Sequence, residues 1–190
     1  MSSDDGISLT VPTAAGMRAL GRSLAALLRA GDLVILSGGL GAGKTTLTQG
    51  IGEGLGVRGP VTSPTFVIAR VHPPAAPDAW GRTGGVGRNL TRPQPALVHA
   101  DAYRLGSALE LDDLDLDTDT AAAVTVVEWG EGLAEGLSAD RLEITITSEP
   151  AISDVLADSA GDMPRTVRIS AVGERWEGIE LPLADLADRL

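Results

Sequence analysis

The chain opens with two short amphipathic patterns. Apolar and polar residues alternate over Ile7–Val11, which predicts a half-buried strand that ends at Pro12. A helix is predicted next, with Thr13 as its N-cap and Gly31 just beyond its C-terminus. Its apolar residues recur at spacings of three and four, as in a helix that packs one face on a sheet: Met17, Leu20, Leu24, Leu27 and Leu28.

The rest of the chain alternates further strands with at least one more helix. Leu33–Leu36 is a continuous apolar run, typical of a strand covered on both faces. A second helix is predicted from about Lys44 to Leu55, ending at Gly56. Further strands are predicted at residues 65–71, 97–100, 125–128, 142–147 and 167–172. This order predicts an α/β fold with a mixed, mostly parallel sheet, antiparallel where the later strands follow one another closely.

Two stretches interrupt this order of elements. Residues 73–95 are rich in Pro, Gly and Arg and have no apolar period, so we interpret them as a surface insertion. Their Gly84-Gly85-Val86-Gly87 lacks a preceding strand and a following helix, so it is interpreted as linker glycine. Residues 148–164 form a second, polar connection. Because neither stretch marks a domain boundary, residues 1–190 are predicted to form one domain.

The segment between the buried strand and the second helix has the spacing of a phosphate-binding loop. It fits G-x-x-x-x-G-K-[ST], in the strand-to-helix context that this motif requires. Glycines let backbone N–H groups face phosphate oxygens, and the helix N-terminus adds positive potential. Lys44 is predicted to reach the β and γ phosphates, Thr45 to offer a hydroxyl to Mg²⁺, and Thr46 to contact the α phosphate. The alternative is a degenerate loop that binds nothing. The candidate nucleotide-binding residues here are Gly38, Gly41, Ala42, Gly43, Lys44, Thr45 and Thr46.

Two acidic residues are candidates for the carboxylate that a phosphate-binding loop needs beside it. Asp101 and Glu128 each end an apolar run, and the carboxyl ends of parallel strands line the ligand crevice of an α/β sheet. Either carboxylate is a candidate for binding Mg²⁺ or orienting water. The alternative for each is a carboxylate that caps the following turn.

Composition narrows the function classes. The 190-residue chain has no cysteine, which excludes disulfides and thiol chemistry, and 15 basic residues against 26 acidic ones give a net charge of −11. A polyanion-binding protein normally presents clustered Lys and Arg, so autonomous DNA or RNA binding is not expected. The N-terminus has no signal-peptide pattern and no apolar run is long enough to span a membrane, so we expect a cytoplasmic protein. Lys44 is the only lysine.

Four motifs in order resemble the TsaE family, small P-loop ATPases of bacterial tRNA threonylcarbamoyladenosine biosynthesis. They are Gly38-Gly39-Leu40-Gly41-Ala42-Gly43-Lys44-Thr45-Thr46, Ser63-Pro64-Thr65-Phe66, His99-Ala100-Asp101-Ala102-Tyr103-Arg104 and Val127-Glu128-Trp129-Gly130-Glu131. The resemblance covers about residues 7–147. It implies a P-loop NTPase-like three-layer sandwich, with helices on both faces of the mixed sheet.

The resemblance also implies roles for individual residues. Lys44, Thr45 and Thr46 would bind the ATP phosphates, and Thr45 and Glu128 would hold Mg²⁺. Asp101 would have the second acidic role at the active site, and Thr65 would belong to a switch-like loop near the γ phosphate. For His99, the resemblance implies a structural or partner-facing role as readily as a catalytic one.

The implied partners are a TsaD-like transferase and a TsaB-like protein, with tRNA contacted only through the complex. ATP hydrolysis would reset the complex between turnovers. Two features depart from the family pattern: Gly39 stands where the family usually has Asp, and residues 73–95 lengthen one connection.

Two other functions use the same loop. A small-molecule kinase would need a cationic lid, for which Arg82, Arg88 and Arg92 are candidates, although surface arginines are commonly just solvated. The second alternative function is a nucleotide-gated interaction module with negligible turnover.

Acidic residues are concentrated in one segment. One interpretation is a helix and turn whose acidic side chains are simply solvated. The alternative is a docking surface for a basic patch on a partner. The six residues are Glu110, Asp112, Asp113, Asp115, Asp117 and Asp119.

Overall fold

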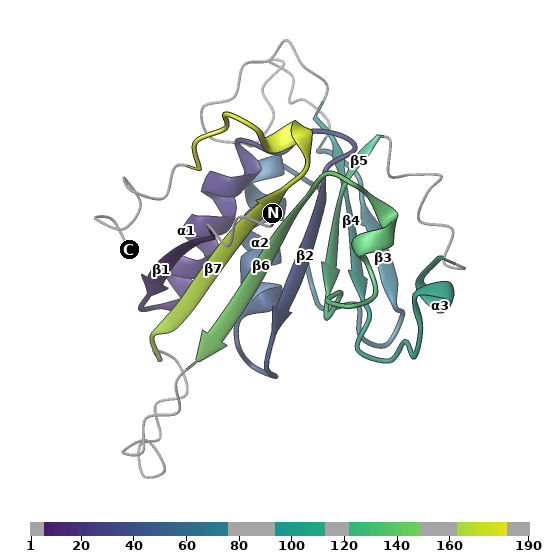
Figure 1. The fold of residues 1–190 in the computed structure, drawn as a ribbon, viewed down its shortest axis with the longest axis horizontal. Coiled ribbons are helices and arrows are strands. Elements are labelled where there is room, and N and C mark those ends of the chain that lie inside the picture. Colours follow the sequence, from purple (N-terminus) through teal and green to yellow (C-terminus); the bar gives the residue numbers. More distant parts are fainter. Residues whose placement is uncertain (1–5, 76–93, 113–121, 149–162, 182–190) are drawn as a thin grey trace.

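The computed structural model describes residues 6–75, 94–112, 122–148 and 163–181, whose strands form one seven-stranded sheet (Figure 1). The strand order is β1-β7-β6-β2-β5-β4-β3. The central strands β6, β2, β5 and β4 are parallel, and the pairings β1–β7, β7–β6 and β4–β3 are antiparallel. The predicted mixed α/β sheet is therefore confirmed. The strands are β1 (Ile7–Val11), β2 (Leu33–Gly38), β3 (Ala69–His72), β4 (Ala96–Asp101), β5 (Ala123–Glu128), β6 (Arg141–Ser148) and β7 (Arg165–Val172).

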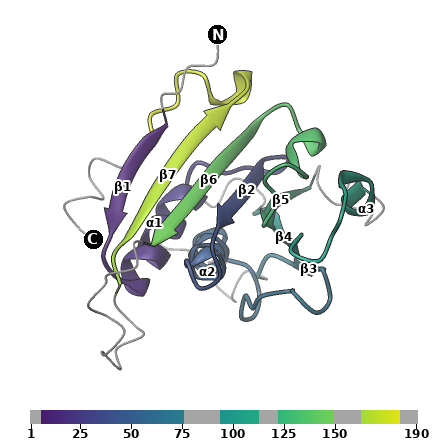
Figure 2. The same cartoon turned by 60° about the horizontal axis from the view of Figure 1, so that its bottom comes forward.

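Two helices, α1 (Ala14–Ala25) and α2 (Lys44–Leu55), lie side by side on one face of the sheet (Figure 2). Thr13 caps α1 as predicted, because its Oγ1 accepts a hydrogen bond of 2.9 Å from the Gly16 N–H. The predicted end of α1 at Gly31 is wrong. The helix ends at Ala25, where i to i−3 hydrogen bonds tighten its last turn, although Leu28 remains buried in the core.

Glycine allows α1 and α2 to approach closely. A Cβ atom added at Gly21 of α1 would lie 2.4 Å from the Leu47 carbonyl oxygen, and one added at Gly50 of α2 would lie 2.3 Å from the Arg18 carbonyl oxygen. Larger residues would push the helices apart, since neither neighbouring backbone can move away without its helix. Close helix packing holds α2, and with it the loop that precedes α2, against the sheet.

The opposite face of the sheet carries shorter elements in the described residues. Helix α3 (Ala108–Asp112) buries Leu111, and the 3₁₀ helix η1 (Glu135–Leu137) follows the buried Ala134. Both belong to a second apolar cluster with strands β2, β4 and β5. Helical elements therefore lie on both faces, as predicted, but the long helices lie on only one. No helix in the described ranges is long and apolar enough to cross a membrane.

The predicted strand at residues 65–71 is wrong in its first half, because β3 begins only at Ala69. Backbone hydrogen bonds from Val67 and Ile68 to the Pro64 carbonyl, 2.8 and 2.7 Å long, form a turn instead. Ile68 has a φ of 69°, a left-handed conformation that redirects the chain into β3. Alternation of apolar residues cannot reveal such a turn.

Several sequence predictions lie mainly outside the described residues. Of the predicted insertion 73–95, only its first three and last two residues are described, and of the connection 148–164 only its ends. The candidate lid arginines Arg82, Arg88 and Arg92 are outside. Of the acidic segment, Glu110 and Asp112 belong to α3, and the remaining four residues are outside.

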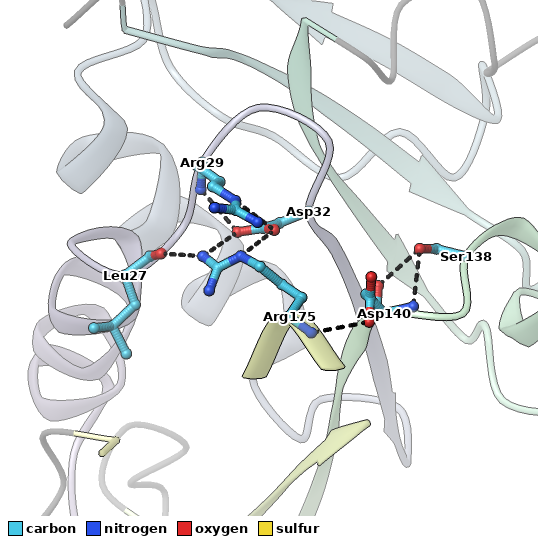
Figure 3. A network of polar contacts seen from close by, with 6 residues as sticks. All are labelled: Leu27, Arg29, Asp32, Ser138, Asp140 and Arg175. Atoms are coloured by element: carbon cyan, nitrogen blue, oxygen red, sulfur yellow. Dashed lines mark hydrogen bonds and ion pairs between the residues drawn. The ribbon is translucent and has the colours of Figure 1, made fainter. Parts of the chain in front are cut away.

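A buried polar network ties the described C-terminal segment to the α1–β2 connection (Figure 3). Arg175, in the 3₁₀ helix η3 (Glu174–Trp176), donates to both carboxylate oxygens of Asp32 at 3.1 and 3.0 Å. Its guanidinium also donates to the Leu27 carbonyl at 2.9 Å. The two side chains are only 9% and 4% exposed, so this ion pair is largely shielded from water. Asp32 immediately precedes β2, whereas the loop to α2 follows that strand, so the ion pair and the loop lie at opposite ends of β2.

Replacing Asp32 with alanine is expected to lower the free energy of unfolding by about 3 kcal/mol, because Arg175 would stay buried without its anion. Nucleotide affinity should not change, since the six residues of β2 separate Asp32 from the loop by roughly 20 Å. Chemical denaturation and nucleotide titration measure the two effects. Glu53→Ala is the matched control: it removes the exposed Arg22–Glu53 pair and should cost at most about 1 kcal/mol. Equal losses in the two variants would contradict the prediction.

Candidate functional site

The loop from Gly38 to Lys44 wraps tightly between the end of β2 and the start of α2. Gly38 has a φ of 139°, and a Cβ there would lie 2.2 Å from the Ile146 carbonyl oxygen. Gly43, which precedes the first turn of α2, has a φ of 109°. Residues that carry a Cβ atom rarely adopt these backbone conformations, so this path of the chain requires glycine at both positions. That path leaves the first N–H groups of α2 free of helical partners, and such groups are anion-binding donors.

Lys44 is buried at the centre of the site. Its Nζ donates to the carbonyl oxygens of Gly38 and Gly39 at 2.7 and 2.9 Å, and lies 3.6 Å from the centre of the Trp129 ring. Burial lowers the pKa of Lys44, while the charges of Glu128 and Asp101 oppose that shift. The ammonium group is thus incompletely compensated, and a bound anion would stabilise it.

Glu128 joins the loop to the neighbouring strand. The Oγ1 of Thr45 donates to Oε2 of Glu128 at 3.1 Å, and Nε2 of His99 lies 2.8 Å from Oε1 of the same carboxylate. Glu128 is 3% exposed, and it ends β5 beside β2 in the parallel sheet. A hydroxyl and a carboxylate oxygen therefore converge at the start of α2.

Asp101 ends the next strand, β4, and is the register partner of Glu128. Its Oδ2 accepts a hydrogen bond of 2.5 Å from the Thr65 hydroxyl, and its Oδ1 accepts one of 2.9 Å from the Tyr103 N–H. The Thr65 hydroxyl also lies 2.6 Å from the Ser63 hydroxyl. Asp101 therefore anchors the turn at residues 63–68, and it also caps the turn after β4, the alternative considered from sequence.

Aromatic side chains form the rim of the site. Trp129 has a φ of 60°, and this left-handed backbone places its ring over Lys44. Tyr103 packs on Trp129 with ring centres 5.0 Å apart, and the Arg104 guanidinium lies 5.1 Å from the ring centre of Phe66. Phe66 and Tyr103 are 86% and 62% exposed. Large exposed rings beside a polar site are typical of a surface that meets a partner.

The structure brings most of the sequence-predicted site residues together: Lys44, Thr45, Thr65, Asp101 and Glu128. Gly38, Gly41, Ala42 and Gly43 form the loop itself, and Thr46 lies in the first turn of α2, half-buried.

Sequence reasoning missed two contacts, of His99 with Glu128 and of Trp129 with Lys44. It also did not single out Arg165, the first residue of β7, whose side chain lies beside the loop at Gly43. A Cβ added at Gly43 would lie 3.4 Å from Nε of Arg165. Two signals pointed to His99: its place in the motif that begins His99-Ala100-Asp101, and the strand periodicity of residues 97–100, which puts alternate residues on one face of the sheet.

Comparison with known proteins decides the family. A family model described as "Threonylcarbamoyl adenosine biosynthesis protein TsaE" matches residues 11–154. A Streptomyces coelicolor protein named tRNA threonylcarbamoyladenosine biosynthesis protein TsaE is 56% identical over 161 residues, which cover 84% of this chain and 93% of that protein. The chain belongs to the TsaE family. A Bacillus subtilis protein of the same name is 35% identical over 84% of this chain and 82% of its own length.

The fold is also similar to that of a solved structure. A crystal structure of Bacillus subtilis YdiB superposes with a TM-score of 0.60 and 28% sequence identity, covering 98% of this chain and 99% of that one. The region that matches the TsaE family model contains the site from the Gly38 loop to Trp129, whereas Arg165 and Arg175 lie beyond it. Membership of this family makes the protein a component of tRNA threonylcarbamoyladenosine biosynthesis.

Proposed function

We propose that this protein is a Mg²⁺-dependent ATPase that works with TsaD-like and TsaB-like proteins in tRNA threonylcarbamoyladenosine formation. The observation that carries the proposal is the convergence of Lys44, Thr45 and Glu128 behind a phosphate-binding loop. The only lysine of the chain lies where a nucleotide's β and γ phosphates need a cation. A loop that had lost phosphate binding would have no reason to bury that charge.

Nucleotide binding would use backbone and side-chain donors of the loop. The N–H groups from Gly41 to Thr45 would supply the phosphate cradle, and the Thr46 hydroxyl would contact the α phosphate. Lys44 would exchange its carbonyl partners for phosphate oxygens, because its charge is better compensated by an anion than by two carbonyl dipoles and a ring.

The donors beside Lys44 suit Mg²⁺. Thr45 Oγ1 and Glu128 Oε2 are the two oxygens that would hold the ion, which usually takes one or two protein oxygens together with phosphate oxygens and water. In the described residues, no group of three or more His, Asp or Glu side chains is arranged to bind a metal alone. Phosphate oxygens and water would complete the coordination of the ion. When bound, Mg²⁺ neutralises charge that develops on the phosphate oxygens.

Asp101 would act through the turn at residues 63–68. Both of its carboxylate oxygens are engaged, by Thr65 and by the Tyr103 N–H, which favours positioning over direct metal binding. We infer that Asp101 and Thr65 together orient the attacking water. Loss of the γ phosphate would then change the position of the exposed Phe66, the residue next to Thr65, at the surface proposed to contact a partner.

The charge balance supports a role through other proteins. With a net charge of −11, the chain is unsuited to holding tRNA by itself, so tRNA contact is assigned to the partner proteins. The kinase alternative receives no support from the described residues, since its candidate lid arginines lie outside them.

Phosphate release by the protein alone and with the TsaB-like and TsaD-like pair tests the proposal. We expect slow release alone and stimulation of at least about tenfold by the pair, because partner contact at the rim would order the turn that holds Thr65. Adding either partner singly is the control for non-specific stabilisation. Fast phosphate transfer to a metabolite without the pair would favour the kinase, and tight ATP binding with no turnover in any mixture would favour the nucleotide-gated module.

A further inference from the structure

His99 lies in β4, two residues before Asp101, with no exposed surface. Its side chain shares the α2 side of the sheet with Glu128, and its Nε2 lies 2.8 Å from Oε1 of that carboxylate. Oε2 of Glu128 is the oxygen that faces Thr45 at 3.1 Å. Each carboxylate oxygen thus has a different partner, so the orientation of the whole group is defined.

The second ring nitrogen of His99 indicates which way the hydrogen bond runs. Nδ1 is buried and has no hydrogen-bond partner among the described residues. A carboxylate oxygen can only accept, so the ring proton lies on Nε2 and is donated to Glu128. An imidazole that served packing alone would be better replaced by an apolar side chain, because its Nδ1 lone pair remains unsatisfied at this place. The hydrogen bond to Glu128 is therefore the contact that a polar ring provides here.

We propose that His99 is a positioning residue: it holds Oε1 of Glu128 so that Oε2 points at Thr45 and is ready to bind the metal ion. The inference rests on the proposed function, since it requires that Glu128 binds Mg²⁺. Carboxylates that bind a metal commonly depend on such hydrogen-bonded partners. Loss of one partner typically lowers metal affinity by about 10- to 100-fold. His99 does not touch the nucleotide in this assignment.

Metal affinity tests the proposal directly. Mn²⁺ binding to the protein saturated with a non-hydrolysable ATP analogue would be followed by electron paramagnetic resonance, and analogue affinity would be measured separately in EDTA. His99→Leu is expected to weaken Mn²⁺ binding by about 10- to 100-fold while metal-free analogue affinity stays within about threefold. His99→Gln should retain most of the metal affinity, because its amide reaches the position of Nε2.

His72→Leu is the matched control. His72 is also buried in the sheet, in β3, and within the part of the chain that the structure describes its Nε2 has no hydrogen-bond partner. This substitution should leave Mn²⁺ affinity unchanged even if it alters the melting temperature. If His99→Leu does not fold, His99→Asn replaces it, because the shorter amide keeps polarity but does not reach Glu128.

Two outcomes would overturn the proposal. Wild-type Mn²⁺ affinity in His99→Leu or His99→Asn would show that the contact is dispensable, and equal losses in His99→Gln and His99→Leu would show that the amide donor restores nothing. Glu128→Gln separates this failure from that of the proposed function. If it lowers Mn²⁺ affinity when His99→Leu does not, only the role of His99 is wrong; if it also binds Mn²⁺ normally, the metal assignment of Glu128 fails as well.

Discussion

Replacing Lys44 with alanine is expected to weaken ATP binding by about 100-fold or more. The reason is the loss of charge-assisted hydrogen bonds to two phosphates, each contributing roughly 1.5–3 kcal/mol, where each 1.4 kcal/mol is about a tenfold change in affinity. The chain has no second lysine to compensate. Isothermal titration with ATP and Mg²⁺ measures the loss.

Lys44→Arg is the control that separates charge from shape. The planar guanidinium keeps the positive charge but not the compact ammonium that fits between Gly38, Gly39 and Trp129, so we expect an intermediate affinity. Both variants should be compared by melting temperature, to exclude unfolding as the cause. Unchanged ATP affinity in the folded alanine variant would refute the assignment of the site.

Glu128→Gln is expected to lower Mg²⁺-dependent ATP hydrolysis by about 100-fold, because the amide keeps the shape of the side chain but removes the charge that would bind the ion. ATP affinity measured in EDTA should change far less, since the carboxylate is not expected to contact the phosphates directly. Phosphate release in the presence of the partner pair, over a Mg²⁺ titration, measures the effect. A variant that loses equally in hydrolysis and in metal-free affinity would count against a metal role.

Asp101→Asn is the matched control for Glu128→Gln. Both substitutions neutralise one carboxylate at the end of adjacent parallel strands, and the two residues are register partners. If Asp101 acts through Thr65, its variant should lose hydrolysis while Mn²⁺ affinity stays near that of the wild type. Loss of Mn²⁺ affinity in Asp101→Asn would make Asp101 a metal ligand instead.

The elements that sequence reasoning located best are those whose causes are local. Helix α2 begins at Lys44 and ends before Gly56 as predicted, and Gly56 has a φ of 69° as a C-terminal glycine should. The predicted end of α1 and the predicted start of β3 were wrong because turns decide both boundaries. A tight turn after Ala25 ends α1, and the turn that begins at Pro64 delays the start of β3. The single-domain assignment of residues 1–190 stays a prediction.

The sequence by itself determined the conformation of the loop between β2 and α2, because Gly38, Gly43 and Lys44 act through backbone conformation and short spacing. It also determined that Asp101 and Glu128 end strands, since a change from apolar to acidic residues marks where each strand leaves the core. Only the tertiary structure decided which side chains meet. His99 and Glu128 are 29 residues apart, Thr65 and Asp101 are 36 apart, and Thr45 and Glu128 are 83 apart. Such contacts depend on the strand order β2-β5-β4 and its register, which arise from packing the whole sheet and are not encoded in any local pattern.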